Sequence, residues 1–340
     1  MGYSMELSIC IPTRNRGSYI ASTIEKLIPQ MCASVEIVVV DGASTDNTSE
    51  IIKNLKNNFS DININYIRLD NNGGVDADLK KAVQYASGRY CWFMSSDDHA
   101  TQDSVCSILN ALSDNPGILL FNRYEADRDM KIFGVTAWLP NLTNTSSWDF
   151  GSPSQAEQYL KTIKTIGAIF SYIPCIVVER KSWLESYSDL LNRTCYAHVY
   201  ACLSLLLSGR RLKYLPSAFV VCRNDNDSFS SGGRIARYNI DFYGYLAISK
   251  LIKEKHREID ILQVVRREHR LFRLSELRSE MHLLQWRQYA SKTLYPIGYG
   301  RLIVMFASLV GSSSGLIGFA KRLYHRAKIV YFKYKNRLYA

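Results

Sequence analysis

The sequence predicts an α/β fold with a doubly wound, mostly parallel sheet, followed by a helical and basic C-terminal region. Apolar runs of strand length alternate three times with segments of helical periodicity, and each run ends in a short polar loop. That alternation is typical of β-α-β crossovers in a parallel sheet. With 340 residues, 47% of them hydrophobic, the chain can fill one large domain with an appendage, or two small domains.

The N-terminal elements have the clearest patterns. A buried strand over residues 7–12 leads into a polar turn, and the next helix has apolar residues at the spacing of a face packed on a sheet: Ile20, Ile24, Leu27 and Ile28. Further strands are predicted at 35–40, 63–69 and 90–94, with helices near 51–55 and 76–86.

The remaining elements follow from shorter patterns. We expect strands at 119–121, 170–180 and 213–222, an apolar helix that stops at Gly209, a polar loop over 223–234 and a helical region over 235–289. The predicted domains are residues 5–232, with halves at 7–115 and 116–232, and a C-terminal region over 233–340.

The positive charge is concentrated at the end of the chain. The net charge is +11, yet residues 281–340 contain no acid and carry ten Lys and Arg residues. The first 280 residues are therefore close to neutral, and we expect no nucleic acid to bind them.

The eight cysteines never stand at C-x-x-C spacing, and no signal-peptide pattern opens the sequence, so we expect a reducing compartment and no structural zinc.

Charged residues follow the predicted strands where each strand ends. Asp97 and Asp98 follow the strand at 90–94, and ligands of open α/β sheets collect at this edge. Two adjacent carboxylates favour a divalent cation or phosphate chemistry there, while the alternative is a helix start capped by Ser95 or Ser96. After the first two strands, Arg14 and Arg16 suit a diphosphate, and Asp41 suits the amino or imino edge of a pyrimidine base or a ribose.

Four ordered motifs carry a family resemblance: residues 11–16 (IPTRNR), 38–46 (VVVDGASTD), 72–74 (NGG) with 86–90 (ASGRY), and 93–98 (FMSSDD). Together they resemble the family 2 glycosyltransferases of the GT-A fold. The resemblance implies transfer of a sugar from a nucleotide-sugar to a hydroxyl group, inversion at the anomeric carbon, and Mg²⁺ or Mn²⁺ as cofactor. It also makes 7–115 the nucleotide-sugar half and 116–232 the acceptor half.

The resemblance assigns roles residue by residue. Asp97 falls on the metal-binding carboxylate of the family's D-x-D motif, and Ser95 stands where the first Asp is usual, which should weaken metal binding. Asp98 or His99 is expected to compensate as a further metal ligand. The predicted nucleotide-sugar-binding residues are Pro12, Thr13, Arg14, Arg16, Asp41, Asp78, Ser95, Ser96, Arg223 and Arg234.

Inverting transfer needs a general base for the acceptor hydroxyl. Where the family carries a Glu-Asp pair at a helix start, this sequence has Ala197-His198, and a neutral imidazole suits the task. His198 is therefore the first choice for the base and Asp189 the second; the alternative for His198 is a partly buried helical residue that hydrogen-bonds a neighbour. The loop that carries Arg223 and Arg234 is either a lid over the diphosphate or a connector.

The tail predicts membrane contact. Residues 302–320 are apolar with a Gly-Ser centre, and aromatic and basic residues follow. This mixture favours an interfacial element on anionic lipid over a transmembrane helix, with a soluble helical hairpin as the remaining alternative.

The variant motif and the histidine are most similar to abequosyltransferase-type members of the family. They imply a CDP-3,6-dideoxyhexose donor such as CDP-abequose and a polyprenyl-diphosphate-linked oligosaccharide acceptor, as in O-antigen synthesis. The expected location is peripheral, at the cytoplasmic face of the bacterial inner membrane. The alternatives are a UDP-sugar transferase for another surface glycan and a non-catalytic nucleotide-sugar-binding protein.

Overall fold

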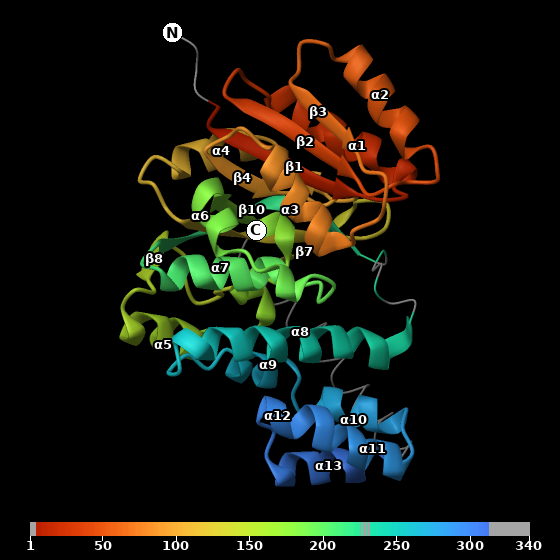
Figure 1. Ribbon diagram of the computed structural model, residues 1–340, viewed down its shortest axis with the longest axis vertical. Coiled ribbons are helices and arrows are strands. Elements are labelled where there is room, and N and C mark those ends of the chain that lie inside the picture. Colours follow the sequence, from red (N-terminus) through yellow and green to blue (C-terminus); the bar gives the residue numbers. More distant parts are fainter. Residues whose placement is uncertain (1–4, 225, 227–228, 230–231, 313–340) are drawn as a thin grey trace. The chain divides into compact units, whose positions relative to one another are not determined.

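The computed structural model describes residues 5–224, 226, 229 and 232–312 (Figure 1). The chain forms two compact units, residues 1–226 and 227–340. The first unit contains the sheet, and the second is helical in its described residues.

The first unit begins with the predicted alternation of strands and helices. Its sheet runs in the order β3-β2-β1-β4, and every pairing among these strands is parallel. The elements are β1 (Leu7–Thr13), α1 (Gly17–Leu27), β2 (Val35–Asp41), α2 (Thr48–Asn58), β3 (Ile64–Arg68), α3 (Val75–Tyr85) and β4 (Tyr90–Phe93). β2 is buried along its whole length, which explains why Glu36 and the terminal Asp41 are its only polar residues.

The sheet continues from β4 through β9, β6 and β10 to β5. β9 is antiparallel to both β4 and β6, so β6 and β10 run in the same direction as the first four strands. The elements are β5 (His99–Ala100), α4 (Ser104–Ala111), β6 (Ile118–Ala126), β7 (Ile132–Thr136), β8 (Ser146–Asp149), α5 (Pro153–Thr162), β9 (Ile176–Glu179), α6 (Arg180–Ser186), α7 (Ala197–Leu207) and β10 (Arg211–Arg223). The described sheet is therefore mostly parallel, as predicted.

One local prediction was wrong, and one alternative is excluded. The strand expected over 170–180 begins only at Ile176, because Phe170 adopts a positive φ of 72° and two 3-10 turns, Ile166–Ile169 and Ile173–Cys175, precede it. Neither Ser95 nor Ser96 caps the next helix, because β5 intervenes and α4 begins after Asp103.

A buried polar cluster ties the N-terminal strands together. Glu36 of β2 accepts hydrogen bonds from the Ser8 hydroxyl (2.6 Å) and from the Ser87 amide (2.7 Å). Gly88 must be glycine here, because a Cβ would lie 2.6 Å from the Ser8 hydroxyl oxygen and 2.7 Å from its amide nitrogen. The small residues of the 86–90 motif therefore allow close contact with β1.

The second unit is a set of helices around its own core. Its helices are α8 (Gly233–Lys255), α9 (Leu262–Glu268), α10 (Leu271–Ser279), α11 (Leu283–Tyr289), a π-helical turn (Ala290–Leu294), α12 (Tyr295–Ile297) and α13 (Arg301–Gly311). Among the described residues, no helix is both long and apolar enough to cross a bilayer. The predicted apolar segment 302–320 is described only as far as residue 312.

Candidate active site

Asp41 ends β2 and lies fully buried in a set of hydrogen bonds. Its Oδ1 accepts the Ser44 amide (2.8 Å), and its Oδ2 accepts the Tyr66 hydroxyl (2.8 Å). Arg68 stands 3.9 Å from the same Oδ2. Burial, with Asp41 beside it, raises the pKa of Tyr66 to about 12, so this hydroxyl stays a donor. The Asp41 carboxylate is thereby held in one orientation.

Asp78, in the first turn of α3, lies beside Asp41. A Cβ on Gly42 would collide with Asp78 Oδ2, and one on Gly73 would lie 2.8 Å from its Oδ1. Asp78 is only 4% exposed, and Oδ1 has no hydrogen-bond partner among the described residues. Burial raises its pKa to about 6, and the Gly73 main-chain amide and the nearby Arg14 oppose this shift only in part. Two buried carboxylates thus meet at the end of β2, one with an unused acceptor.

Asp98 follows β4, and its carboxylate accepts three hydrogen bonds from other residues of the protein. It accepts the Arg223 amide (2.9 Å), the Tyr172 hydroxyl (2.5 Å) and the Ser95 hydroxyl. It is 3% exposed, and burial, together with the adjacent Asp97, raises its pKa. Asp98 therefore fixes the loop after β4, and Ser95 is turned toward it.

His99, the other residue predicted as a compensating metal ligand, also has a different partner. Its Nε2 lies 3.1 Å from the Ser22 hydroxyl, and the residue belongs to β5, which pairs with β10. Burial lowers the pKa of His99 to about 4, so the ring is neutral.

Asp97 is the more accessible carboxylate of the pair and has cations and a donor around it. Arg16 lies 3.7 Å from its Oδ2, and Asn226 donates to the same oxygen (2.7 Å). Arg223 donates from Nε to the Asp97 main-chain oxygen (3.0 Å) and lies over the Tyr19 ring at 5.1 Å. The structure thus brings Arg16, Asp97 and Arg223 together from separate predicted motifs.

The chemistry of this group suits a divalent cation bound with a phosphate. Among the described residues, no three His, Cys, Asp or Glu side chains gather as a metal cluster. Mg²⁺, however, commonly binds one or two carboxylates together with substrate phosphates and water. Asp97, whose Oδ1 lacks a partner among the described residues, supplies such a carboxylate.

Arg123 and Tyr172 stack on each other and extend the hydrogen bonds of Asp98 to β6, a contact that the sequence analysis did not predict. The Arg123 guanidinium lies 3.9 Å from the centre of the Tyr172 ring and pairs with Glu125 at 2.9 Å. Tyr172 in turn donates to Asp98. Arg123 could be suspected only as a charged residue within the apolar pattern of β6.

His198 occupies the second position of α7 and is 3% exposed. Its Nε2 lies 2.9 Å from the Phe170 carbonyl oxygen, which can only accept, so Nε2 carries the proton and Nδ1 holds the lone pair. Burial lowers the pKa of His198 to about 4. The ring is therefore neutral, with the tautomer fixed by α7 and the turn before β9.

Asp76 positions the start of α7, although the sequence did not single it out. Its carboxylate accepts the amides of Cys195 (2.8 Å) and Ala197 (3.0 Å), so it caps the helix that carries His198. The signal that could have found it is the pair of acids, Asp76 and Asp78, in the first turn of α3.

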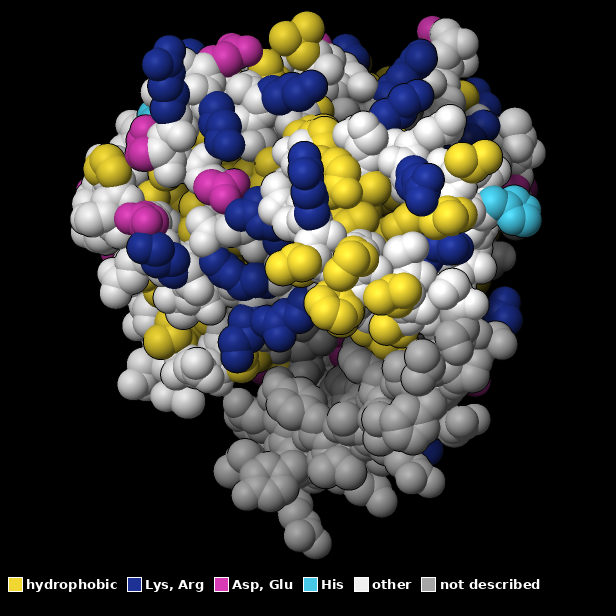
Figure 2. All heavy atoms as spheres, turned by 90° about the horizontal axis from the view of Figure 1, so that it is seen from below, with side chains coloured by type: hydrophobic (Ala, Val, Ile, Leu, Met, Phe, Trp, Pro, Cys, Tyr) yellow, Lys and Arg dark blue, Asp and Glu magenta, His cyan; other side chains and the backbone are white. Residues whose placement is uncertain are grey.

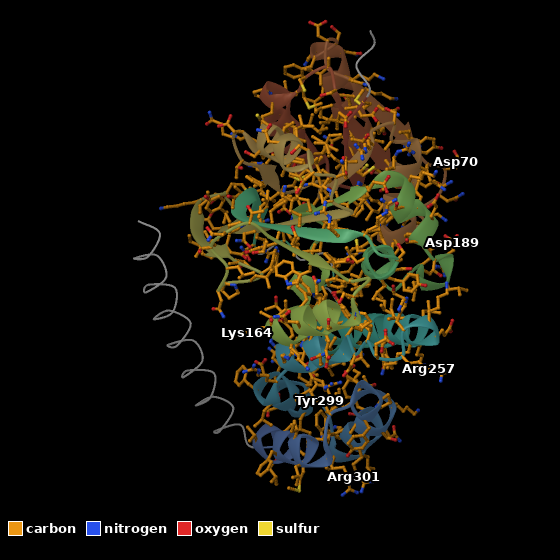
Figure 3. All side chains as sticks on the ribbon, turned by 90° about the vertical axis from the view of Figure 1, so that its left-hand side faces the viewer. Asp70, Lys164, Asp189, Arg257, Tyr299 and Arg301 are labelled. Atoms are coloured by element: carbon orange, nitrogen blue, oxygen red, sulfur yellow. The ribbon has the colours of Figure 1, made fainter. Side chains whose placement is uncertain are left out.

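Asp189, the second choice for the base, lies at the surface of the first unit (Figure 3). Both of its oxygens accept from Lys80 Nζ at 2.8 Å, and this bond lowers its pKa. Arg234, predicted with Arg223 on one loop, belongs to the second unit and pairs there with Glu276 and Glu280, each at 3.4 Å.

Pro12 and Thr13 end β1 beside the carboxylates, and Ser96 follows β4 as a buried residue. The Thr13 hydroxyl oxygen is buried without a partner among the described residues. The predicted nucleotide-sugar residues of the first unit thus lie at the ends of β1, β2, β4 and β10, on α3, and in the loops that follow these strands.

Residues 8–177 match the profile of glycosyl transferase family 2. The chain belongs to this family. As a family 2 glycosyltransferase it is similar to the abequosyltransferase RfbV of Salmonella typhimurium, with 33% identity over 251 residues, 72% of this chain and 74% of that protein. It is also similar to the UDP-Glc:alpha-D-GlcNAc-diphosphoundecaprenol beta-1,3-glucosyltransferase WfaP of Escherichia coli, with 29% identity over 41% of this chain and 54% of that one.

Solved structures show that this glycosyltransferase has the GT-A fold. The S. aureus protein TarS, residues 1–349, matches with a TM-score of 0.64 at 18% identity, over 86% of this chain and 80% of that chain. The mannosyltransferase PcManGT from Pyrobaculum calidifontis, solved with GDP-Man and Mn²⁺, matches with a TM-score of 0.53 at 14% identity. This match covers 91% of the present chain and 87% of PcManGT.

Proposed function

We propose that this glycosyltransferase moves a 3,6-dideoxyhexose such as abequose from its CDP-activated form to a lipid-linked oligosaccharide, with inversion at the anomeric carbon. The observation that carries the proposal is the 33% identity to an abequosyltransferase over 72% of the chain. The product is then an intermediate of O-antigen or a related surface polysaccharide.

The paired carboxylates at the end of β2 support a cytidine donor. An ionised carboxylate can only accept hydrogen bonds, and Asp78, with a pKa of about 6, is mainly ionised at pH 7.5. Cytosine presents an N4 amino group with two donors, where uracil presents an oxygen that would face the carboxylates unfavourably. Asp78 Oδ1, which lacks a partner among the described residues, is suited to one of these donors.

The residues around Asp97 are proposed to hold the diphosphate. Asp97 would bind Mn²⁺ or Mg²⁺, which when bound neutralises charge on the leaving nucleoside diphosphate. Arg16 and Arg223 supply positive charge from two further elements, and guanidinium groups match phosphate oxygens in bidentate geometry. The Asp98 network keeps the Arg223 main chain fixed.

His198 is proposed as the general base, through Nδ1. Its Nε2 bond to Phe170 keeps the lone pair on Nδ1, so a hydroxyl of the acceptor can pass its proton there as the bond to the sugar forms. Asp189 remains the second choice, with its carboxylate bound to Lys80. Inversion follows from a single displacement, since the hydroxyl attacks opposite to the leaving diphosphate.

The name of one relative supports the proposed acceptor and location. WfaP acts on a diphosphoundecaprenol-linked sugar, as its name states. We propose an acceptor of the same kind, and hence a peripheral position at the cytoplasmic face of the inner membrane. WfaP also supports the second candidate function, a UDP-glucose-type transferase for another surface glycan.

Calorimetry of the purified chain with CDP, UDP, GDP and dTDP, each with and without Mn²⁺, tests the donor. We expect CDP to bind at least about tenfold more tightly than UDP, because one lost charged hydrogen bond is worth about 1.5–3 kcal/mol. Asp78→Asn should reduce this preference, while Asp70→Asn, an exposed carboxylate after β3, should not. Tighter binding of UDP would instead support the second candidate.

A further inference from the structure

Helix α13 is apolar on two opposite faces. Val304, Ala307 and Gly311 are buried, and the helix packs with that face against α10. Leu302, Ile303, Met305, Phe306 and Leu309 lie on the other side, each 45% to 68% exposed. Single exposed apolar residues are ordinary, but five large ones on one short helix mark a contact surface. We call these five residues the outer face of α13.

A pocket of about 340 Å³ adjoins the outer face. It is lined by two arginines and by apolar side chains, among them Ile303 and Phe306 of the outer face; the others include Arg266, Arg270, Leu271 and Tyr299. Tyr299 lies just before α13, whose first residue is Arg301 (Figure 3). It donates to the His269 carbonyl oxygen (2.7 Å), so this wall of the pocket is fixed.

The two arginines of the pocket differ in their partners. Arg266 pairs with Asp260 (2.7 Å) and donates to the Ile297 carbonyl oxygen (2.6 Å), so its charge is compensated. Arg270 is exposed and donates only from Nε, to the Arg267 carbonyl oxygen (3.1 Å), within the described part of the chain. Its two terminal nitrogens are therefore available for a phosphate, next to apolar residues that suit a hydrocarbon chain.

The charge around the outer face of α13 favours anionic lipid over a second copy of the chain as its binding partner. Arg301 is exposed at the start of α13, Arg287 and Lys292 are exposed on the two helical segments 283–294, and residues 281–340 contain no acid. Figure 2, seen from the side where α11 and α13 lie in Figure 1, shows hydrophobic side chains with more Lys and Arg than Asp and Glu among them. A second copy of the chain would bring like charges together, whereas anionic lipid offers opposite charge and an apolar interior.

The length of α13 determines how it would meet the lipid. Its 11 residues span about 16 Å, roughly half of the hydrocarbon thickness of a bilayer. Helices of this kind lie in the plane of the interface, with the apolar face toward the acyl chains.

We propose that the outer face of α13 lies in the interface of an anionic phospholipid bilayer, with a lipid phosphate bound by Arg270 in the adjoining pocket. The proposal deepens the proposed function, because it names the surface that holds the enzyme near a lipid-linked acceptor. It rests on that function only for the lipid-linked nature of the acceptor, and the contact itself is independent of the sugar transferred.

Co-sedimentation of the full-length chain with phosphatidylglycerol-containing vesicles and with pure phosphatidylcholine vesicles tests the proposal. We expect Arg270→Gln to weaken binding to anionic vesicles about fivefold at low salt, the equivalent of about 1 kcal/mol. Arg257→Gln, a matched change of an exposed arginine outside the pocket, should have little effect. Ile303→Ser combined with Phe306→Ser should reduce binding at least about tenfold at every salt concentration, because salt does not screen the apolar contribution.

Three results would overturn the proposal. The first is equal vesicle binding by the wild type and the Ile303→Ser, Phe306→Ser variant. The second is a concentration-dependent dimer that the variant abolishes in sedimentation velocity, since the face would then bind a second copy. The third is a clear loss of thermal stability in that variant with vesicle binding unchanged, since the face would then be covered within the chain. Calorimetry with CDP on the same proteins separates these results from a failure of the proposed function.

Discussion

The most specific prediction concerns Asp78, whose charged carboxylate should favour binding of the sugar donor and lower the stability of the fold. Its carboxyl is 4% exposed, and its pKa is raised from the ordinary 3.8 to about 6. A raised pKa means that the folded state holds the proton more tightly than the unfolded chain, so stability falls as the pH rises from about 4 to about 6 and stays reduced above that range. This rise in the pKa of Asp78, from 3.8 to about 6, corresponds to at most about 3 kcal/mol in the free energy of unfolding.

Asp78→Asn removes this ionisation while nearly keeping the side-chain shape. We therefore expect the variant to be more stable than the wild type by about 2–3 kcal/mol at pH 7.5, and nearly equal to it at pH 4. CDP binding should weaken by about tenfold or more, since the carboxylate acceptor is lost.

Urea unfolding at several pH values, with calorimetry of CDP, measures both effects. Asp70→Asn is the matched control, because Asp70 is exposed and such surface changes stay within about 0.5 kcal/mol. A lower stability of Asp78→Asn at pH 7.5, or the same pH dependence as the wild type, would refute the reasoning from burial.

Four further substitutions probe the rest of the site. Asp97→Ala should abolish Mn²⁺-dependent turnover and Mn²⁺-enhanced CDP binding without unfolding the protein; a near wild-type rate would exclude Asp97 as the metal ligand. In His198→Gln, the new amide can still donate a hydrogen bond to the Phe170 carbonyl oxygen but cannot act as a base. This variant should lower kcat by about 10² or more with little change in CDP affinity. If Asp189→Ala is the inactive variant instead, the base is Asp189. Tyr172→Phe should lower the free energy of unfolding by about 1.5–3 kcal/mol in urea, because Asp98 loses a hydrogen bond; unchanged stability would show that this bond contributes nothing.

The N-terminal half of the fold could be predicted because β1, β2 and β4 are almost entirely buried. Such strands appear in the sequence as mostly apolar runs, as in β2, and the polar loops at their ends mark one edge of the sheet. The run from Phe170 to Cys175 is equally apolar but forms 3-10 turns, because Pro174 limits the backbone and Phe170 takes a positive φ. Apolar composition alone does not separate these cases.

The site could be predicted only in part, because several of its residues form hydrogen bonds with residues far away in the sequence. The motifs predicted that Arg16, Asp41 and Asp97 stand at neighbouring strand ends, since parallel strands share an edge. They did not predict that Asp98 would bind Tyr172, 74 residues away, or that Asp76 would cap a helix 121 residues along the chain. The roles of Asp98 and His99 as metal ligands stay predictions, and the structure gives both residues other partners.

The central claim, inverting transfer from a CDP-sugar to a lipid-linked acceptor, is tested most directly by the product itself. The full-length protein with Mn²⁺, a CDP-3,6-dideoxyhexose and a polyprenyl-diphosphate oligosaccharide should add one dideoxyhexose to the acceptor by mass spectrometry. The new glycosidic bond should have the anomeric configuration opposite to that of the donor by NMR. Retention of configuration, or transfer from UDP-sugars but not from CDP-sugars, would contradict the account.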